Sequence, residues 1–122
     1  LLAGMQFVKH HGVERIAEAE RRLTELAAGH LAELPGVEVF AANRPTDQTG
    51  VLSFRVKGMD SEAVGAALGR RGFALRAGLH CAPLAHRTAG TVDTGTVRCS
   101  FSAFNTPREV DMLARALAGS LK

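Results

Sequence analysis

The stretch from Val13 to Leu34 constrains the fold of this chain more than any other feature of its sequence. Its apolar residues recur at spacings of three, four and seven, and charged residues fill most positions between them. This pattern predicts one long amphipathic helix, which Pro35-Gly36 ends. The apolar stripe consists of Ile16, Leu23, Leu26, Ala27, Leu31 and Leu34.

The remaining segments predict a small sheet and two more helices. Residues 51–56 alternate apolar and polar side chains, as do residues 96–101, and weaker strand signals lie at 37–40 and 73–76. Further helices are predicted over 60–71 and after the capping box Thr106-Pro107-Arg108-Glu109, whereas 41–50 and 78–95 are expected to be irregular. The order predicts one two-layer α+β domain, with helices packed on one face of a short, mostly antiparallel sheet.

Composition excludes several classes of function. A net charge of +3, with six Phe and no Trp or Tyr, argues against a nucleic-acid-binding protein. The sequence contains no run of 18 or more apolar residues, the length that predicts a transmembrane helix, so no membrane partner is expected. Two cysteines do not make the disulfide framework of a small secreted domain. Two free thiols in a reducing cytosol are the simpler interpretation, and the predicted localisation is cytoplasmic.

The segment from Arg76 to Thr106 contains most of the candidate chemistry. Cys81 follows His80 and lies five residues after Arg76, in a stretch rich in glycine. A thiol near positive charge becomes a nucleophile when its thiolate is stabilised. A buried, inert cysteine is the alternative for Cys81, and the alternation of its strand predicts that role for Cys99.

Two arginines are predicted to lie on the sheet face away from the core. Arg98 is out of phase with Val97 and Cys99, and Arg76 is out of phase with Leu75. Two guanidinium groups near one loop could hold a carboxylate through paired hydrogen bonds. The alternative is two solvated surface arginines.

A metal site would require His80, Cys81 and His86 to act together. Structural zinc normally has four ligands in closely spaced pairs, and no fourth ligand follows at a suitable spacing. We therefore predict no metal.

Three sequence runs resemble the C-terminal part of cysteine desulfurases. They are Arg76–Pro83, Gly95–Ser100 and Asn105-Thr106, the last followed by Glu109 and Asp111. More broadly, the chain is similar to the small domain of class V aminotransferase-fold enzymes, which use pyridoxal phosphate (PLP). The resemblance extends over essentially the whole chain, and the Suf-type and selenocysteine-lyase-like group is the most similar.

The resemblance implies a role for four residues. Cys81 matches the nucleophile that attacks the substrate sulfur and carries the persulfide. Arg98 matches the arginine that binds the substrate α-carboxylate, and Arg76 matches an arginine that lines the substrate pocket. His80 matches a motif position, which suggests proton transfer or tuning of the thiolate.

The resemblance also implies that residues 1–122 are the C-terminal small domain of a larger PLP enzyme whose PLP-binding domain is absent here. The family's cofactor-binding lysine belongs to that large domain, and Lys9, Lys57 and Lys122 have no matching context. The fragment is therefore expected to hold no PLP and to be inactive alone. The implied partners of the intact enzyme are L-cysteine or L-selenocysteine, a sulfur-acceptor protein as in iron–sulfur cluster assembly, its own large domain, and a second copy in a homodimer.

Two departures from the family pattern keep other functions open. The span from Cys81 to Arg98 is slightly longer than in the Suf-type pattern, and Pro83 comes one place earlier. A different PLP reaction of a class V relative is one alternative. A non-catalytic α+β module, which keeps the motif only for its fold and uses the arginine face as an interface, is the other.

Overall fold

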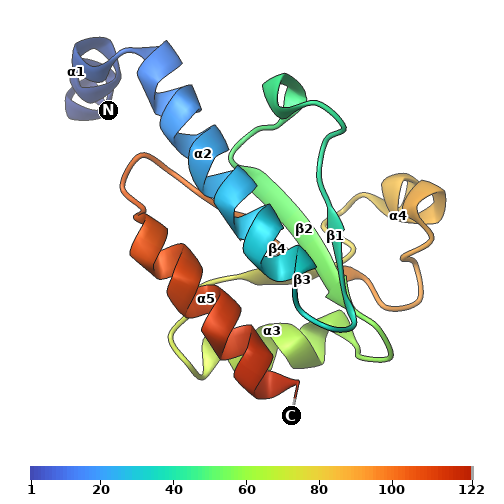
Figure 1. Cartoon of the computed structure of the whole chain (residues 1–122). Helices are drawn as coiled ribbons and strands as arrows, with labels where there is room; N and C mark the ends of the chain where they lie inside the picture. The colour runs from blue at the N-terminus through green and yellow to red at the C-terminus, as the bar shows by residue number, and fades with distance from the viewer. Residues whose placement is uncertain (122) are drawn as a thin grey trace.

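The computed structural model describes residues 1–121, and Lys122 lies outside them. Five α-helices and four β-strands follow one another along this part of the chain (Figure 1). They are α1 (Leu2–His11), α2 (Val13–Ala32), β1 (Val37–Phe40), the 3-10 turn η1 (Pro45–Asp47), β2 (Val51–Val56), α3 (Ser61–Gly69), β3 (Arg76–Gly78), α4 (Pro83–Ala89), β4 (Thr96–Ser100) and α5 (Pro107–Ser120).

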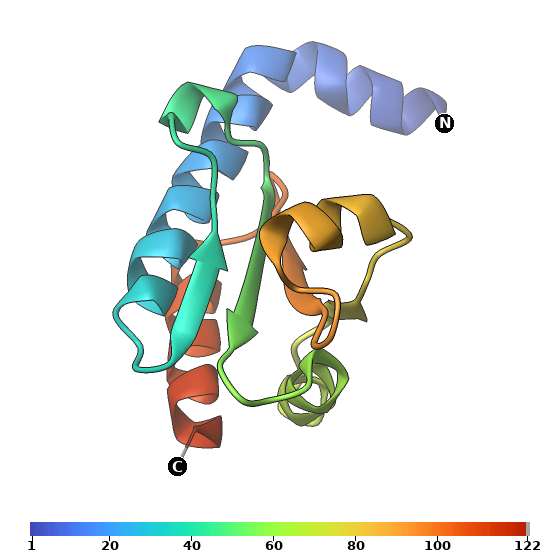
Figure 2. The same ribbon diagram turned by 90° about the vertical axis from the view of Figure 1, so that its right-hand side faces the viewer.

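The four strands form one antiparallel sheet in the order β1-β2-β4-β3. Helices α2 and α5 run side by side along one face of this sheet, with α3 near its end (Figures 1 and 2). The predicted α+β fold with an antiparallel sheet is therefore confirmed, and α2 and α5 form the predicted helix layer on one face. Within residues 1–121, no helix is long and apolar enough to cross a membrane.

The core lies between the sheet and these helices. Leu52 and Phe54 of β2 are fully buried, as are Val97 of β4, Leu31 of α2 and Leu117 of α5. Burying each side chain of this size contributes about 1.5–3 kcal/mol to stability. The alternation that predicted the inner faces of β2 and β4 is confirmed, because every second residue of both strands packs into this core.

The helix boundaries follow the predicted capping signals. The backbone N–H of Ala63 donates to the Asp60 carboxylate at the start of α3, at 3.1 Å. At the start of α5, the N–H of Thr106 donates to the Glu109 carboxylate and the N–H of Glu109 donates to the Thr106 hydroxyl. This reciprocal pair is a capping box.

Helix α4 and strand β3 differ from the prediction. Helix α4 lies in the stretch 78–95, for which the sequence predicts irregular structure, and it packs on the sheet face opposite α2 and α5 (Figure 2). Its single buried residue is the polar His86, so it has no apolar period that would reveal it. The strand predicted at 73–76 lies at 76–78 instead. Phe73 and Leu75 pack against the core, which accounts for their apolar side chains, but they are not paired with another strand.

The end of β3, the start of α3 and the loop before β4 meet at Gly95. Gly95 has φ +62°, and a Cβ atom there would lie 2.6 Å from Ser61 Oγ and 2.9 Å from the Gly78 backbone. The N–H of Gly78 donates to Ser61 Oγ at 3.2 Å, and the N–H of Ser61 donates to the Thr94 carbonyl at 3.1 Å. Only glycine combines this backbone conformation with so close an approach.

We expect Gly95→Ala to lower the free energy of unfolding by about 2–5 kcal/mol, because the cost of a left-handed alanine adds to the cost of overpacking the site. Gly58→Ala is the matched control, because Gly58 has φ +76° and open space around it. Gly58→Ala should lower the free energy of unfolding by about 1–2 kcal/mol. Urea unfolding of both variants measures the difference, and equal losses would contradict the close approach at Gly95.

Candidate active site

Arg76 and Arg98 lie directly opposite each other in the pairing of β3 with β4. Residues that are directly paired in antiparallel strands have their side chains on the same face of the sheet. Val97 and Ala77 pack on the core side, so both arginines lie on the other face, as predicted. Ser53 of β2 pairs with Arg98 from the opposite side and shares this face.

Cys81 lies on a tight turn between β3 and α4, and it is exposed. Both His80 (φ +51°) and Cys81 (φ +60°) adopt the left-handed backbone conformation, and the N–H of Ala82 donates to the Leu79 carbonyl at 2.9 Å. A left-handed conformation costs a residue other than glycine about 1–2 kcal/mol. Two adjacent residues of this kind therefore need support from their surroundings, and such strain is concentrated at functional sites.

The His80 side chain connects this turn to β4. Its Nε2 atom lies 3.1 Å from the Thr96 carbonyl oxygen and 3.2 Å from the Thr96 hydroxyl. A proton on Nε2 satisfies the carbonyl, and this assignment leaves Nδ1 as an acceptor. Nδ1 is buried and has no hydrogen-bond partner among residues 1–121.

The surroundings of His80 keep its ring neutral. Burial lowers the pKa of His80 below its usual 6.5, and the positive charge of Arg98 acts in the same direction, as do smaller contributions from His86 and Arg76. The hydrogen bond to the Thr96 carbonyl opposes this shift. At neutral pH, the residue next to Cys81 is therefore an uncharged imidazole with a free acceptor nitrogen.

A cavity of about 300 Å³ lies between α4 and the polar face of the sheet. Arg98 and His80 line it, and Arg98 Nε is buried without a hydrogen-bond partner among the described residues. Cys81 is not among the lining residues, but its neighbours His80 and Ala82 are. The full lining is Phe40, Ser53, His80, Ala82, Ala85, His86, Ala89, Thr91, Thr96 and Arg98.

The structure adds residues to the predicted site. Thr96 lies two positions before Arg98 on the same strand. The alternation that predicts the face of Arg98 therefore predicts the same face for Thr96. Sequence reasoning considered His86 only as a metal ligand and did not find Thr91, because the helix beside them lacks an apolar period. The local signals of this helix are Pro83 in its first turn and Gly90 at its C-terminus. The predicted residues Arg76, His80, Cys81 and Arg98 all lie at this end of the sheet, with Arg76 and Cys81 exposed beside the cavity.

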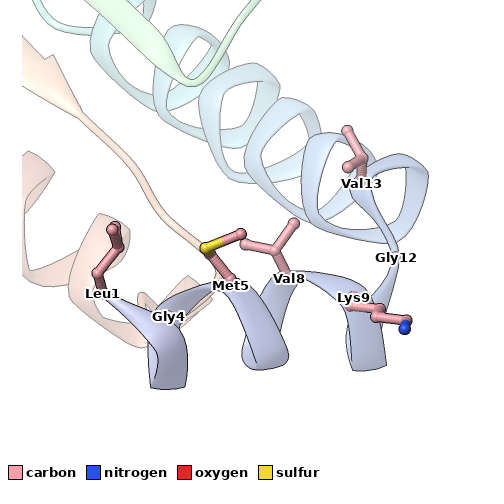
Figure 3. A pocket seen from close by; sticks show the side chains of 7 residues that line it. All are labelled: Leu1, Gly4, Met5, Val8, Lys9, Gly12 and Val13. Atoms are coloured by element: carbon pink, nitrogen blue, oxygen red, sulfur yellow. The ribbon is translucent and has the colours of Figure 1, made fainter.

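A larger cavity, of about 800 Å³, lies elsewhere, in the angle between α1 and the start of α2 (Figure 3). Its side chains are those of Leu1, Met5, Val8, Lys9 and Val13. It is an apolar groove whose one ionisable side chain is that of Lys9. The arrangement offers no pair of groups for acid–base or nucleophilic chemistry.

The described residues form neither a metal site nor a PLP attachment site. Residues 1–121 contain no group of three His, Cys, Asp or Glu side chains placed to bind a metal ion, so His80, Cys81 and His86 do not form the site considered above. The cavity beside Cys81 has no lysine or carboxylate in its lining, and Lys9 and Lys57 are exposed at other places. These residues therefore do not fit the part of an enzyme that attaches PLP.

We expect the two cysteines to differ sharply in reactivity. Cys81 is exposed, whereas burial raises the pKa of the Cys99 thiol to about 12. A thiol reagent at pH 8 should modify one cysteine of the folded chain and two in denaturant, as counted by mass spectrometry. The Cys81→Ser variant should react only in denaturant. Modification of Cys99 at the rate of Cys81 in the folded chain would contradict this placement.

Curated relatives match almost the whole chain. It is 41% identical over 117 residues to a probable cysteine desulfurase of Mycolicibacterium paratuberculosis, a match that covers 96% of this chain and 16% of that protein. It is 37% identical over 115 residues to a cysteine desulfurase of Synechococcus elongatus, covering 94% of this chain and 18% of that protein. The chain thus spans less than a fifth of the length of these two relatives.

Solved structures of cysteine desulfurases also match nearly the whole chain. The cysteine desulfurase of Thermococcus onnurineus NA1, in its apo form, superimposes with a TM-score of 0.90 at 30% identity, over 97% of this chain and 29% of that one. Cysteine desulfurase CsdA of Escherichia coli gives a TM-score of 0.86 at 30% identity, over 98% of this chain and 28% of that one.

The family model for class-V aminotransferases matches residues 1–113. This match includes the whole sheet, the Cys81 turn, both arginines and the first half of α5. The chain belongs to the aminotransferase class-V family.

Proposed function

We propose that this chain is the small, C-terminal domain of a PLP-dependent cysteine desulfurase, and that Cys81 accepts the sulfur atom of L-cysteine. The observation that carries the proposal is the exposed Cys81 on a strained turn beside the cross-strand pair Arg76 and Arg98. Cysteine desulfurases that match over nearly the whole chain support it.

In this proposal the two arginines bind the α-carboxylate of the substrate. Arg98 extends from the middle of the sheet, between β2 and β3, so its guanidinium group is attached to a rigid strand. Two neighbouring positive charges on one face disfavour each other and favour an anion between them. A guanidinium group also matches the geometry of a carboxylate with two parallel hydrogen bonds.

The proposed reaction transfers one sulfur atom. The Cys81 thiolate attacks the sulfur of the substrate cysteine, and a sulfur–sulfur bond forms while the bond between the substrate's Cβ and its sulfur breaks. L-cysteine and the Cys81 thiol give alanine and a persulfide on Cys81, so atoms and electrons balance. His80, neutral and with Nδ1 free, is proposed to hold or relay a proton beside this thiol.

PLP, in this proposal, supplies the electron sink for the bond cleavage. The part of the enzyme that attaches it lies outside residues 1–121. Transfer of the persulfide sulfur to an acceptor protein, the use of L-selenocysteine, a homodimeric enzyme and a cytoplasmic location also belong to the proposal.

The PLP-loaded enzyme that contains this domain provides the main test. We expect Cys81→Ser to reduce alanine release from L-cysteine by at least about 100-fold, because no thiol accepts the sulfur. We expect Arg98→Lys to raise KM for L-cysteine by about 10–100-fold, since hydrogen bonds between charged groups contribute about 1.5–3 kcal/mol. Arg70→Lys, an exposed change at the end of α3, is the control. Alanine release that Cys81→Ser leaves unchanged would contradict the proposal and favour another reaction or an interaction module.

The titration of His80 gives a second test. We expect its NMR signals to titrate below pH 6.5, because burial and Arg98 lower its pKa. Between the folded pKa and 6.5, the unfolded chain binds a proton that the folded chain does not, so the free energy of unfolding falls as the pH is lowered through this window. His80→Asn should remove this part of the pH dependence. A His80 titration at or above pH 6.5 would contradict the assignment.

A further inference from the structure

Helix α4 is fastened to the sheet by polar contacts rather than by an apolar interface. Its single buried side chain is that of His86, and its residues Ala85 and Ala89 line the cavity instead of filling a core. A helix of seven residues does not hold its shape by itself. The few hydrogen bonds that connect α4 to its surroundings therefore determine its position.

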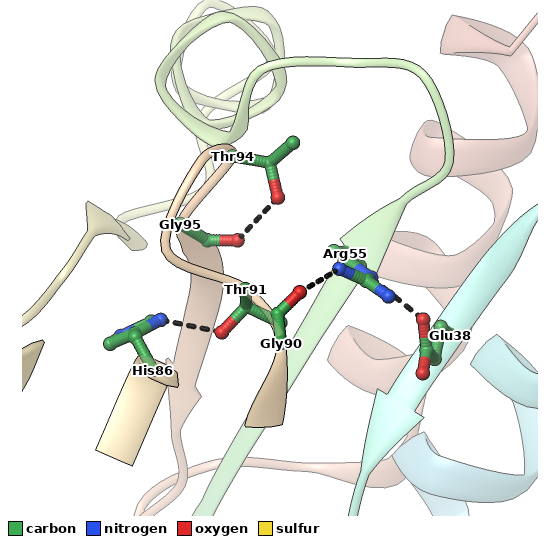
Figure 4. A network of polar contacts seen from close by, with 7 residues as sticks. All are labelled: Glu38, Arg55, His86, Gly90, Thr91, Thr94 and Gly95. Atoms are coloured by element: carbon green, nitrogen blue, oxygen red, sulfur yellow. Dashed lines mark hydrogen bonds and ion pairs between the residues drawn. The ribbon is translucent and has the colours of Figure 1, made fainter. Parts of the chain in front are cut away.

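The first fastening contact comes from Arg55 of β2. Arg55 Nε donates to the carboxylate of Glu38 on β1 at 2.7 Å, and Arg55 Nη1 donates to the carbonyl of Gly90 at 2.8 Å (Figure 4). Glu38 and Arg55 are paired across the two strands, and the guanidinium lies 5.9 Å from the Phe40 ring centroid. Gly90 caps the C-terminus of α4, where helix carbonyls favour a positive charge.

The second fastening contact lies between His86 and Thr91. Nδ1 of His86 is 2.7 Å from the hydroxyl of Thr91, and both residues are buried (Figure 4). The Thr91 N–H also donates to the His86 carbonyl at 2.9 Å, and the Gly95 N–H donates to the Thr91 carbonyl at 2.8 Å. These bonds join α4 to the segment that leads into β4.

The turn that contains Cys81 is held between two anchors. On one side, β3 is paired with β4 and Gly78 is bonded to Ser61. On the other side, α4 begins at Pro83, two residues after Cys81, and the His86 N–H donates to the Ala82 carbonyl at 3.2 Å. Since the left-handed conformations of His80 and Cys81 are costly, both anchors must hold for the turn to persist.

We propose that Arg55 is a positioning residue for Cys81: with Glu38 it holds the C-terminus of α4, and with the His86–Thr91 contact it keeps the Cys81 turn in its strained shape. The contacts themselves do not depend on any activity. Their consequence for catalysis rests on the proposed function, in which the thiol must reach a substrate sulfur.

Hydrogen exchange on the 122-residue chain tests the anchor directly. In Arg55→Met, which keeps most of the apolar stem and loses both donors, we expect the amides of His86, Gly90 and Thr91 to exchange about tenfold faster, the factor expected from the loss of one charged hydrogen bond. Thr91→Val, which keeps the side-chain shape and loses the hydroxyl, should also speed the exchange of these amides. The exchange rates of the α5 amides should stay within about twofold of those of the unchanged chain, which excludes a general loss of stability.

The matched control is Arg22→Met. Arg22 Nε donates to the Glu18 carboxylate at 2.9 Å, much as Arg55 does to Glu38, but on an exposed face of α2 far along the chain from α4. It should leave the exchange of α4 unchanged. If exchange of the α4 amides were unchanged in both Arg55→Met and Thr91→Val, the proposal that these contacts hold α4 would be wrong, whatever the activity of the enzyme.

Kinetics of the PLP-loaded enzyme test the positioning role. We expect Arg55→Met to lower kcat for alanine release by about tenfold and to leave KM for L-cysteine unchanged, because Arg98 stays in place. Arg55→Lys, which keeps one charged donor, should recover part of kcat. Faster exchange with unchanged kcat would overturn the positioning role. If Cys81→Ser also kept full activity, the proposed function would fail instead, and the exchange result would still stand.

Discussion

Strand β4 lies between β2 and β3, and its alternating side chains serve two purposes at once. Val97 and Cys99 fill the core between the sheet and the helices, whereas Thr96 and Arg98 line the cavity on the other face. Because a strand alternates with a period of two, a shift of one residue in its pairing would turn all of these side chains over. The pairing with β2 and β3 is therefore the constraint on which both the core and the candidate site depend.

This arrangement places a rigid part and a strained part side by side. Arg98 is held in the middle of the sheet, where its backbone is bonded to strands on both sides. Cys81 lies on an exposed turn in a left-handed conformation, next to a short helix without an apolar core contact of its own. A site that binds one end of a small molecule and brings a thiol to the other end requires both properties.

The face on which Arg98 lies could be predicted from the sequence, because successive side chains of a strand point to opposite faces of its sheet. The face predicted for Arg76 was right, but it was inferred from Leu75, which lies outside β3. The long amphipathic helix and the capping box at Thr106 are equally local signals, and the structure confirms them. Helix α4 could not be predicted in this way. Its alanines line a cavity and its one buried residue is polar, so the apolar period by which a helix is recognised is missing.

The apolar residues of the core and the inner faces of β2 and β4 could be predicted from the sequence alone, since they follow from periodicities of two and 3.6 along the chain. The sequence also singled out Cys81 and its neighbours as the candidate site. The three-dimensional fold was needed to bring Arg76 opposite Arg98, to let Arg55 of β2 reach the end of α4, and to lower the pKa of His80 through burial. These properties depend on contacts between segments far apart in the chain and on burial, and no local pattern encodes them.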